Sequence, residues 1–210
     1  MHLEARNFLN YCKKTFEPFY KGRVLDVGSG DINGNNRIYF NSEIKEYVGC
    51  DVYPGPNVTV CMPCHELEYP DAYFDMIISS ECFEHDMHYN KTLQAIYRML
   101  ANGGLFVFTC ASFGRAEHGT RRTSIGDSFS TALSPDSGWP DYYKNLTAYD
   151  IVNSLSPLGS INDLFSYSAF YYNTLSKDLY FVGIKNKDKD KDKDNKIYVE
   201  YVERGVSRAD

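Results

Sequence analysis

Residues 23–34, with the sequence RVLDVGSGDING, constrain the fold of this chain more than any other segment. Val24, Leu25 and Val27 form a short apolar run of the kind that fills a strand buried on both faces of a parallel sheet. Gly28 and Gly30 follow directly, and glycine lets a chain turn sharply and lets its backbone approach a bound molecule. A buried strand that runs into a glycine loop predicts an α/β nucleotide-binding fold, with the ligand at the carboxyl end of the strand.

The charge on this loop indicates which kind of cofactor it takes. A dinucleotide loop, G-x-G-x-x-G, would have its third glycine where this chain has Asn33, and the Lys-Ser/Thr pair of a P-loop is missing as well. Asp26 and Asp31 lie beside the glycines, and a carboxylate about 4 Å from a pyrophosphate oxygen costs about 4 kcal/mol at an effective dielectric of about 20. These residues favour a cofactor with positive charge, such as the ammonium and sulfonium of S-adenosylmethionine.

A second predicted strand, residues 47–51, also ends in an acidic side chain. Asp51 lies 21 residues beyond Gly30, about the spacing at which an acidic residue accepts hydrogen bonds from both hydroxyls of a ribose. Hydrogen bonds to a charged acceptor contribute about 1.5–3 kcal/mol each. Asp51 does not distinguish S-adenosylmethionine from NAD(P), because both cofactors contain a ribose.

Four motifs in a fixed order carry a resemblance to a known family. They are VLDVGSG, YVGCD at 47–51, FDMIISSECFEH at 74–85, and RMLANGG followed by LFVFT at 98–109. They are similar to class I S-adenosylmethionine-dependent methyltransferases, and most similar to methyltransferase-11-like domains, over about residues 20–185. The resemblance implies a doubly wound, Rossmann-like α/β fold. Its mostly parallel, seven-stranded sheet would have the order 3-2-1-4-5-7-6 and end in a C-terminal antiparallel hairpin.

The resemblance implies S-adenosyl-L-methionine as the cofactor. It assigns Cys64, His65 and Glu66 to the loop that brackets the adenine ring, while Ser80 and Glu81 follow a predicted strand and reach the pocket mouth. The complete predicted cofactor site is Asp26, Gly28, Ser29, Gly30, Asp51, Val52, Cys64, His65, Glu66, Ser80 and Glu81.

No metal is expected from the sequence. Cys61 and Cys64 have C-x-x-C spacing, but neither a second such pair nor an H-x-x-x-H motif follows to complete a zinc site. His85 is interpreted as a structural residue rather than a proton carrier.

Residues 112–145 form a long segment with little periodicity just past the fifth strand, and such loops in compact domains are often functional. The segment is predicted to bind the acceptor. His118 has a suitable ordinary pKa, about 6.5, to act as a general base, and Glu117 is predicted to orient it or to replace it.

Three arginines in this segment, Arg115, Arg121 and Arg122, suit a carboxylate or phosphate on the acceptor. Pairing with nearby aspartates in a solvated loop is an equally good interpretation of them. Trp139 and Tyr142 are predicted to wall the acceptor pocket, or to pack the loop itself.

The hydrophobic pattern predicts the other elements. Residues 102–104, Asn-Gly-Gly, predict a helix stop, and Thr147 with Asp150 resembles a capping box. The pattern predicts helices over 3–17, 37–40, 88–101 and 148–155, strands over 58–61, 76–79 and 105–109, and hairpin strands over 161–172 and 179–184.

Domain organisation follows from these elements and from the composition of the C-terminus. Residues 1–185 are predicted to form one methyltransferase domain. Residues 186–196 alternate Lys and Asp and are predicted to be a disordered linker, and residues 197–210 a tail with one short strand over 197–202.

Composition is that of an acidic globular protein. The 210 residues include 22 Lys and Arg against 28 Asp and Glu, and the net charge of −6 disfavours nucleic acid as a partner. No apolar run has the length of a membrane span and the N-terminus lacks a signal-peptide core, so no membrane association is expected. The six cysteines are interpreted as reduced thiols in a cytoplasmic protein.

The predicted function is transfer of a methyl group from S-adenosyl-L-methionine to oxygen or nitrogen of a small-molecule acceptor, anionic or sugar-like. Two alternatives stay open. One is an NAD(P)-dependent oxidoreductase on a related fold, and the other is a partner subunit that binds S-adenosylmethionine without catalysis.

Overall fold

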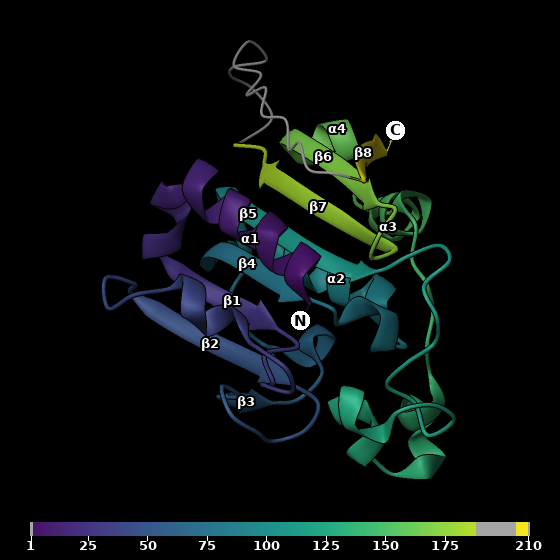
Figure 1. Ribbon diagram of the computed structural model, residues 1–210. Coiled ribbons are helices and arrows are strands. Elements are labelled where there is room, and N and C mark those ends of the chain that lie inside the picture. The colour runs from purple at the N-terminus through teal and green to yellow at the C-terminus, as the bar shows by residue number, and fades with distance from the viewer. Residues whose placement is uncertain (1, 188–204, 210) are drawn as a thin grey trace.

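An eight-stranded sheet forms the centre of the computed structural model, which describes residues 2–187 and 205–209 (Figure 1). Its strands are β1 (Arg23–Val27), β2 (Glu46–Asp51), β3 (Val60–Cys61), β4 (Phe74–Ser80), β5 (Leu100–Ala111), β6 (Phe165–Asn173), β7 (Asp178–Lys185) and β8 (Val206–Ala209). The order β3-β2-β1-β4-β5-β7-β6-β8 confirms the predicted one and adds β8. β1 to β5 are parallel, whereas β7 is antiparallel to β5 and β6. The predicted α/β fold is therefore confirmed.

The eighth strand comes from the C-terminal tail. β8 pairs antiparallel with β6, with Ser207 opposite Tyr172, and covers the sheet edge that β6 would otherwise present. The strand predicted over 197–202 lies outside the described residues, as does most of the predicted linker 186–196.

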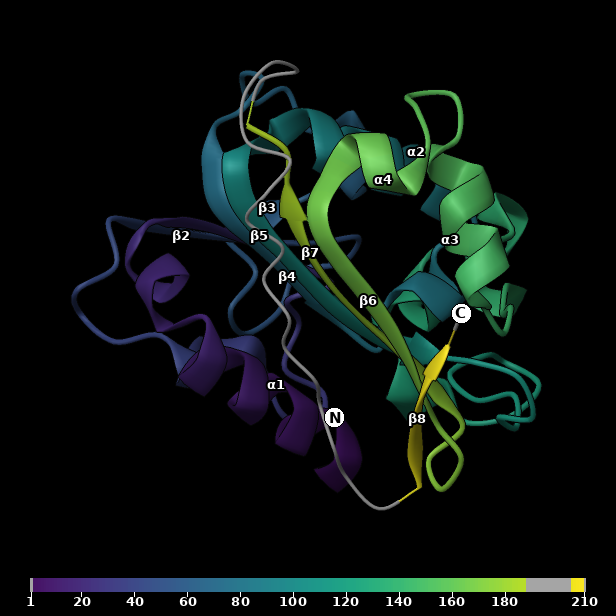
Figure 2. The same cartoon turned by 90° about the horizontal axis from the view of Figure 1, so that it is seen from above.

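Helices cover both faces of the sheet (Figure 2). One face carries α1 (Leu3–Thr15), and the other carries α2 (Tyr89–Met99), α3 (Ala148–Leu155) and α4 (Ile161–Leu164). Successive strand residues point to opposite faces. Val24 of β1 accordingly packs in the layer of Phe8 from α1, and Leu25 packs in the layer of Leu93 from α2.

Residues 112–145, the segment predicted to bind the acceptor and named the acceptor loop after that prediction, extend past the carboxyl ends of the parallel strands (Figure 1). The part of this loop between residues 125 and 141 consists of short 3-10 helices separated by turns. The 3-10 helices of the described residues are η1 (Glu17–Lys21), η2 (Asn36–Tyr39), η3 (Cys64–Glu66), η4 (Phe83–His85), η5 (Ile125–Asp127), η6 (Phe129–Ala132), η7 (Pro135–Ser137) and η8 (Trp139–Asp141).

The first crossover differs from the predicted helix. Between β1 and β2 the structure has only η2, because the side chain of Asp31 closes a turn over the preceding residues. Its carboxylate accepts hydrogen bonds from the amide N–H of Gly34 (3.0 Å) and from Nδ2 of Asn35 (2.7 Å). Asp, Asn and Gly favour such turns over helix.

The helix predicted over 88–101 is confirmed as α2, but it ends at Met99, and residues 102–104, predicted to stop it, belong to β5. Leu100 already pairs with Phe74 of β4, and the register shifts before Leu105 pairs with Met76. Gly103, with φ of 76°, lies in that irregularity, where glycine is favoured.

The elements after the acceptor loop agree with the prediction in part. The predicted capping box at α3 is confirmed by reciprocal hydrogen bonds between Thr147 and Asp150. Residues 161–164, predicted as the start of a strand, form α4, because the Ser160 hydroxyl accepts a hydrogen bond from the amide N–H of Asp163 at 3.3 Å and caps a helical turn. Within residues 2–187 and 205–209, the structure contains no helix with the length and apolar character that crossing a membrane requires.

Candidate active site

A cavity of about 450 Å³ opens at the carboxyl ends of β1, β2 and β4. Parallel strands present their carboxyl ends at one edge of the sheet, where α/β folds bind ligands. The acceptor loop closes the opposite wall. Eleven predicted site residues line the cavity: Gly28, Gly30, Asp51, Val52, Cys64, Ser80, Glu81, Arg115, Glu117, His118 and Trp139.

The glycine loop requires its two glycines for steric reasons. Gly28 has φ of 72°, and a Cβ there would lie 2.5 Å from the Sγ atom of Cys82. A Cβ on Gly30 would lie 2.1 Å from the ring of Phe129, a residue of η6 in the acceptor loop. Because Gly28 and Gly30 have no side chains, the loop after β1 leaves room for Cys82 and for the ring of Phe129 from the acceptor loop.

Asp51 holds this loop and still faces the cavity. Its Oδ2 atom accepts a hydrogen bond from the amide N–H of Gly30 at 3.0 Å, and its Oδ1 atom accepts one from Val52 at 2.7 Å. A carboxylate offers about four acceptor sites, so Asp51 can still accept a hydrogen bond from a ligand. Burial raises the pKa of Asp51, and the backbone N–H groups oppose that rise.

Asp26, by contrast, does not line the cavity. Its carboxylate is buried and accepts hydrogen bonds from Nδ2 of Asn36 at 2.8 Å and from the hydroxyl of Tyr47. Burial raises the pKa of Asp26 to about 7. Asp26 therefore supports the loop from behind, and the negative charge that a cofactor meets comes from other residues.

Glu81 brings negative charge to the cavity directly and anchors the start of the chain. The ring of His2 lies 3.2 Å from Glu81 and 2.8 Å from Asp178, both measured from its Nε2 atom. Although burial opposes protonation, the hydrogen bonds with Asp178 and Glu81 raise the pKa of His2 to about 10. Glu81 has φ of 51°, a strained backbone conformation of the kind found at functional sites.

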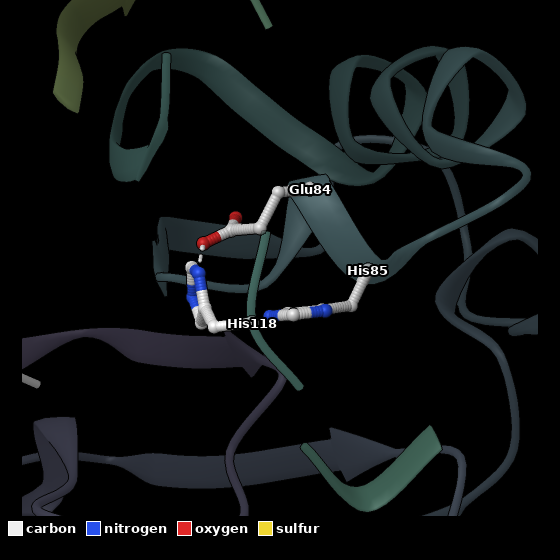
Figure 3. A group of neighbouring side chains, drawn as sticks. All are labelled: Glu84, His85 and His118. Carbon is white, nitrogen blue, oxygen red and sulfur yellow. Dashed lines mark ion pairs between the residues drawn. The ribbon is translucent and has the colours of Figure 1, made fainter. Parts of the chain in front are cut away.

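Glu84, His85 and His118 converge from η4 and the acceptor loop (Figure 3). His85 and His118 line the cavity, and Glu84 is buried beside them. The Nε2 atom of His118 lies 4.0 Å from Oε1 of Glu84, and the two imidazole rings are 5.1 Å apart between centroids. Burial and the neighbouring His118 lower the pKa of His85 to about 3. Burial and the charge of Glu81 raise the pKa of Glu84 well above its usual range.

Glu117 lines the cavity, but it does not contact His118 as predicted. Its Oε1 atom accepts hydrogen bonds from the hydroxyl of Thr120 at 2.7 Å and from Nε of Arg122 at 3.0 Å. These two partners lower the pKa of Glu117 and disfavour it as a base. The carboxylate nearest to His118 in the cluster is Glu84.

The three predicted acceptor-binding arginines are paired within the protein. Arg121 and Arg122 lie outside the cavity lining and both contact Asp141. Arg115 lines the cavity, donates a hydrogen bond to the carbonyl of Ser176 at 2.5 Å and lies 3.5 Å from Asp178.

Four other predicted site residues lie outside the cavity lining: Ser29, His65, Glu66 and Tyr142. The hydroxyl of Ser29 donates a hydrogen bond to the carbonyl of Asn57 at 3.2 Å, and Nε2 of His65 lies 3.8 Å from Glu66.

Sequence reasoning did not predict 18 of the residues that line the cavity, among them His2, His85, Asp127 and Phe129. His2, Asp127 and Phe129 are far from every motif in the sequence and reach the cavity only through the fold. His85 did have a signal, because it follows the fourth strand in the segment SECFEH.

The fold and this cavity define a class I methyltransferase architecture, with β7 inserted antiparallel between β5 and β6. Residues 25–108 match the family model described as a methyltransferase domain. This match confirms the predicted resemblance to S-adenosylmethionine-dependent methyltransferases, and S-adenosyl-L-methionine as the predicted cofactor agrees with it. No curated protein matches the chain in sequence.

Solved structures extend the similarity to most of the chain. Burkholderia thailandensis 1,6-didemethyltoxoflavin-N1-methyltransferase, with bound 1,6-didemethyltoxoflavin and S-adenosylhomocysteine, has a TM-score of 0.55 at 14% identity, over 85% of this chain and 76% of that one. Haemonchus contortus phosphoethanolamine N-methyltransferase 2, in complex with S-adenosyl-L-methionine, has a TM-score of 0.57 at 17% identity, over 86% of this chain and 53% of that one. A SAM-dependent methyltransferase from Archaeoglobus fulgidus has a TM-score of 0.52 at 17% identity, over 86% of this chain and 94% of that one. At these identities the likeness shows the fold alone.

Proposed function

We propose that this chain transfers a methyl group from S-adenosyl-L-methionine to a small-molecule acceptor, at oxygen or nitrogen. The observation that carries the proposal is one cavity lined both by the glycine loop with Asp51 and by two histidines, His85 from η4 and His118 from the acceptor loop. Gly28, Gly30 and Asp51 would hold the nucleoside, and the residues at 115–118 would face the acceptor.

Methyl transfer is an in-line displacement at carbon. The bond from sulfur to the methyl carbon breaks with its electron pair going to sulfur, and the acceptor's oxygen or nitrogen forms the new bond. The acceptor loses a proton when it is a hydroxyl or an ammonium. Alignment supplies much of the rate, because well-oriented intramolecular reactions gain about 7–11 kcal/mol. We assign the loss of the acceptor's proton to the cluster of Glu84, His85 and His118.

The two alternative functions have weaker support. A dinucleotide-binding oxidoreductase would have an all-parallel sheet of order 3-2-1-4-5-6, whereas this sheet inserts the antiparallel β7. A C-terminal tail left free for another protein would favour a non-catalytic partner subunit, but residues 206–209 of the tail pair with β6.

Calorimetric titration and a transfer assay test the proposal together. S-adenosylhomocysteine is expected to bind and NADH is not, and labelled methyl is expected on one member of a panel of hydroxyl and amine acceptors. NADH binding without S-adenosylhomocysteine binding would overturn the proposal. Cofactor binding with no labelled product would favour the partner subunit.

The His118→Ala variant tests the acceptor side separately. We expect it to bind S-adenosylhomocysteine as the unmodified chain does and to lose turnover. Undiminished turnover would remove His118 from the reaction.

A further inference from the structure

We propose that Glu84, His85 and His118 bind one divalent transition-metal cation at the acceptor side of the cavity. One ligand atom from each side chain lies within 4.8 Å of the others. Figure 3 shows the Glu84 carboxylate pointing to the ring of His118, with the ring of His85 beside them. Ligation at about 2.0–2.2 Å would draw these atoms together by several tenths of an ångström.

The first argument for a cation is geometric: Nε2 of His118 and Oε1 of Glu84 face each other without a hydrogen bond between them. The Nδ1 atom of His118 lies 3.1 Å from the carbonyl oxygen of Ala116, which can only accept, so Nδ1 donates and Nε2 is the ring nitrogen left to bind an ion. Nε2 lies 4.0 Å from Oε1 of Glu84, too far for a direct hydrogen bond. A cation between the two atoms would satisfy both.

The second argument is that the buried groups of the cluster lack partners. Glu84 is fully buried, and neither of its carboxylate oxygens has a hydrogen-bond partner among the described residues. The Nδ1 atom of His85, a residue 7% exposed, has none either. An unpaired buried carboxylate is costly, and buried charges are normally paired or coordinate metals.

A second group of similar composition provides a contrast. His2, Glu81 and Asp178 also lie close enough together to hold an ion. There the Nε2 atom of His2 lies 3.2 Å from Glu81 and 2.8 Å from Asp178, so a proton on the imidazole already joins the carboxylates. In the group with Glu84, by contrast, the imidazole of His118 stays 4.0 Å from the carboxylate.

The ligand types indicate the class of ion. Two imidazoles and one carboxylate suit zinc, iron, cobalt or nickel in the divalent state, whereas magnesium and calcium prefer oxygen ligands alone. The carbonyl of Ala116 orients His118 from outside, as is usual for metal-bound histidine. His85 and His118 both line the cavity, so free coordination positions would face the acceptor.

A metal ion at this place would extend the proposed function, and the catalytic role of the ion rests on that proposed function. An acceptor oxygen bound to the ion would have a lowered pKa and would release its proton to water before attacking the methyl carbon. His118 then acts as a ligand rather than as the base, and the acceptor class is one with a hydroxyl that can bind a metal.

Cobalt binding tests the site without using activity. The full-length chain, stripped with a chelator, is titrated with Co²⁺ and followed by visible d–d absorption, with Zn²⁺ competition measured by calorimetry. We expect one ion per chain. Glu84→Gln and His118→Ala should each weaken binding by about 10-fold or more, the scale on which even outer-sphere changes act.

His88→Ala serves as the matched control, because His88 is a nearby histidine that packs against His65 and Trp139 outside the cluster. It should bind Co²⁺ as the unmodified chain does. Circular dichroism and thermal melting verify that each variant is folded. If Glu84→Gln unfolds, His118→Ala alone decides, since His118 lies on the cavity side of the loop.

Equal Co²⁺ binding by the unmodified chain and the folded cluster variants would overturn the site, and so would the absence of stoichiometric binding. S-adenosylhomocysteine titrated into the same samples separates the two proposals. Cofactor binding without an ion leaves methyl transfer intact, whereas an ion bound without cofactor binding contradicts methyl transfer and leaves the metal site.

Discussion

Replacing Asp51 by asparagine tests the cofactor site most directly. The two oxygens of Asp51 accept hydrogen bonds from the amides of Gly30 and Val52, and their remaining lone pairs are available to ribose hydroxyls. Asparagine keeps one oxygen and puts an NH₂ group in place of the other. The variant therefore loses either a ribose hydrogen bond or a bond that shapes the glycine loop.

The size of the effect follows from one charged hydrogen bond. Such a bond contributes about 1.5–3 kcal/mol, which corresponds to roughly 10- to 150-fold in the dissociation constant. We expect Asp51→Asn to weaken S-adenosylhomocysteine binding by that factor in calorimetric titration. Because the variant keeps the shape of the side chain, thermal unfolding should show that the fold is retained.

The control for this experiment is Asp75→Asn. Asp75 also accepts a backbone hydrogen bond, from the amide N–H of Arg23 at 2.8 Å, but these residues lie at the amino ends of their strands, opposite the cavity. Its cofactor affinity should match that of the unmodified chain. A folded Asp51→Asn variant that binds S-adenosylhomocysteine within threefold of the control would refute the role of Asp51.

Three further predictions concern other parts of the site. His2→Asn should destabilise the fold by about 3–5 kcal/mol, because it removes the imidazole that pairs with Glu81 and with the buried Asp178. In the unmodified chain this contribution should be complete below about pH 6.5, where unfolded histidine is protonated, and decline as pH rises towards 10, the pKa of His2 in the fold. Denaturant unfolding of both chains from pH 6 to 10 measures the loss of stability and its pH dependence. A difference in unfolding free energy that does not change with pH would contradict the ion pair. Gly119→Ala would place a Cβ 2.6 Å from Cε1 of His85, so steady-state assays should show slower turnover while S-adenosylhomocysteine affinity is unchanged. Arg121→Ala removes a partly exposed pair with Asp141, so stability should fall by less than about 1 kcal/mol and the acceptor KM should stay constant; a large rise in that KM would restore an anion-binding role for Arg121.

The parallel strands could be predicted from sequence because each is a short apolar run followed by polar residues. The order of the strands followed from the family resemblance. Asp51 and Gly30 are close in the fold because both sit where adjacent strands end, and that follows from topology alone. The first crossover was mispredicted because Asp31 makes a local side-chain turn that competes with helix.

The orientation of Asp26 could also have been predicted. Alternate residues of a strand share a face. Leu25 and Val27 belong to the layer under α2, so Asp26 must point with Val24 towards the layer under α1. The cluster of Glu84 and His118 had no comparable signal, because a long loop without periodicity brings residues 34 positions apart into contact.

The sequence predicts a preference for a cationic methyl donor from Asp26 and Asp31 of the glycine loop, but in the structure this preference rests on other residues. Five carboxylates line the cavity, on Asp51, Glu81, Asp86, Glu117 and Asp127, against the single guanidinium of Arg115. The positive groups are already engaged, since Arg115 and His2 both contact Asp178. Carboxylates therefore outnumber cationic groups in the cavity wall. A pyrophosphate would be repelled at about 4 kcal/mol for each unpaired carboxylate 4 Å away at an effective dielectric of about 20, whereas a sulfonium and an ammonium would be attracted. Because partly buried charges are screened little by salt, this discrimination should persist at physiological ionic strength.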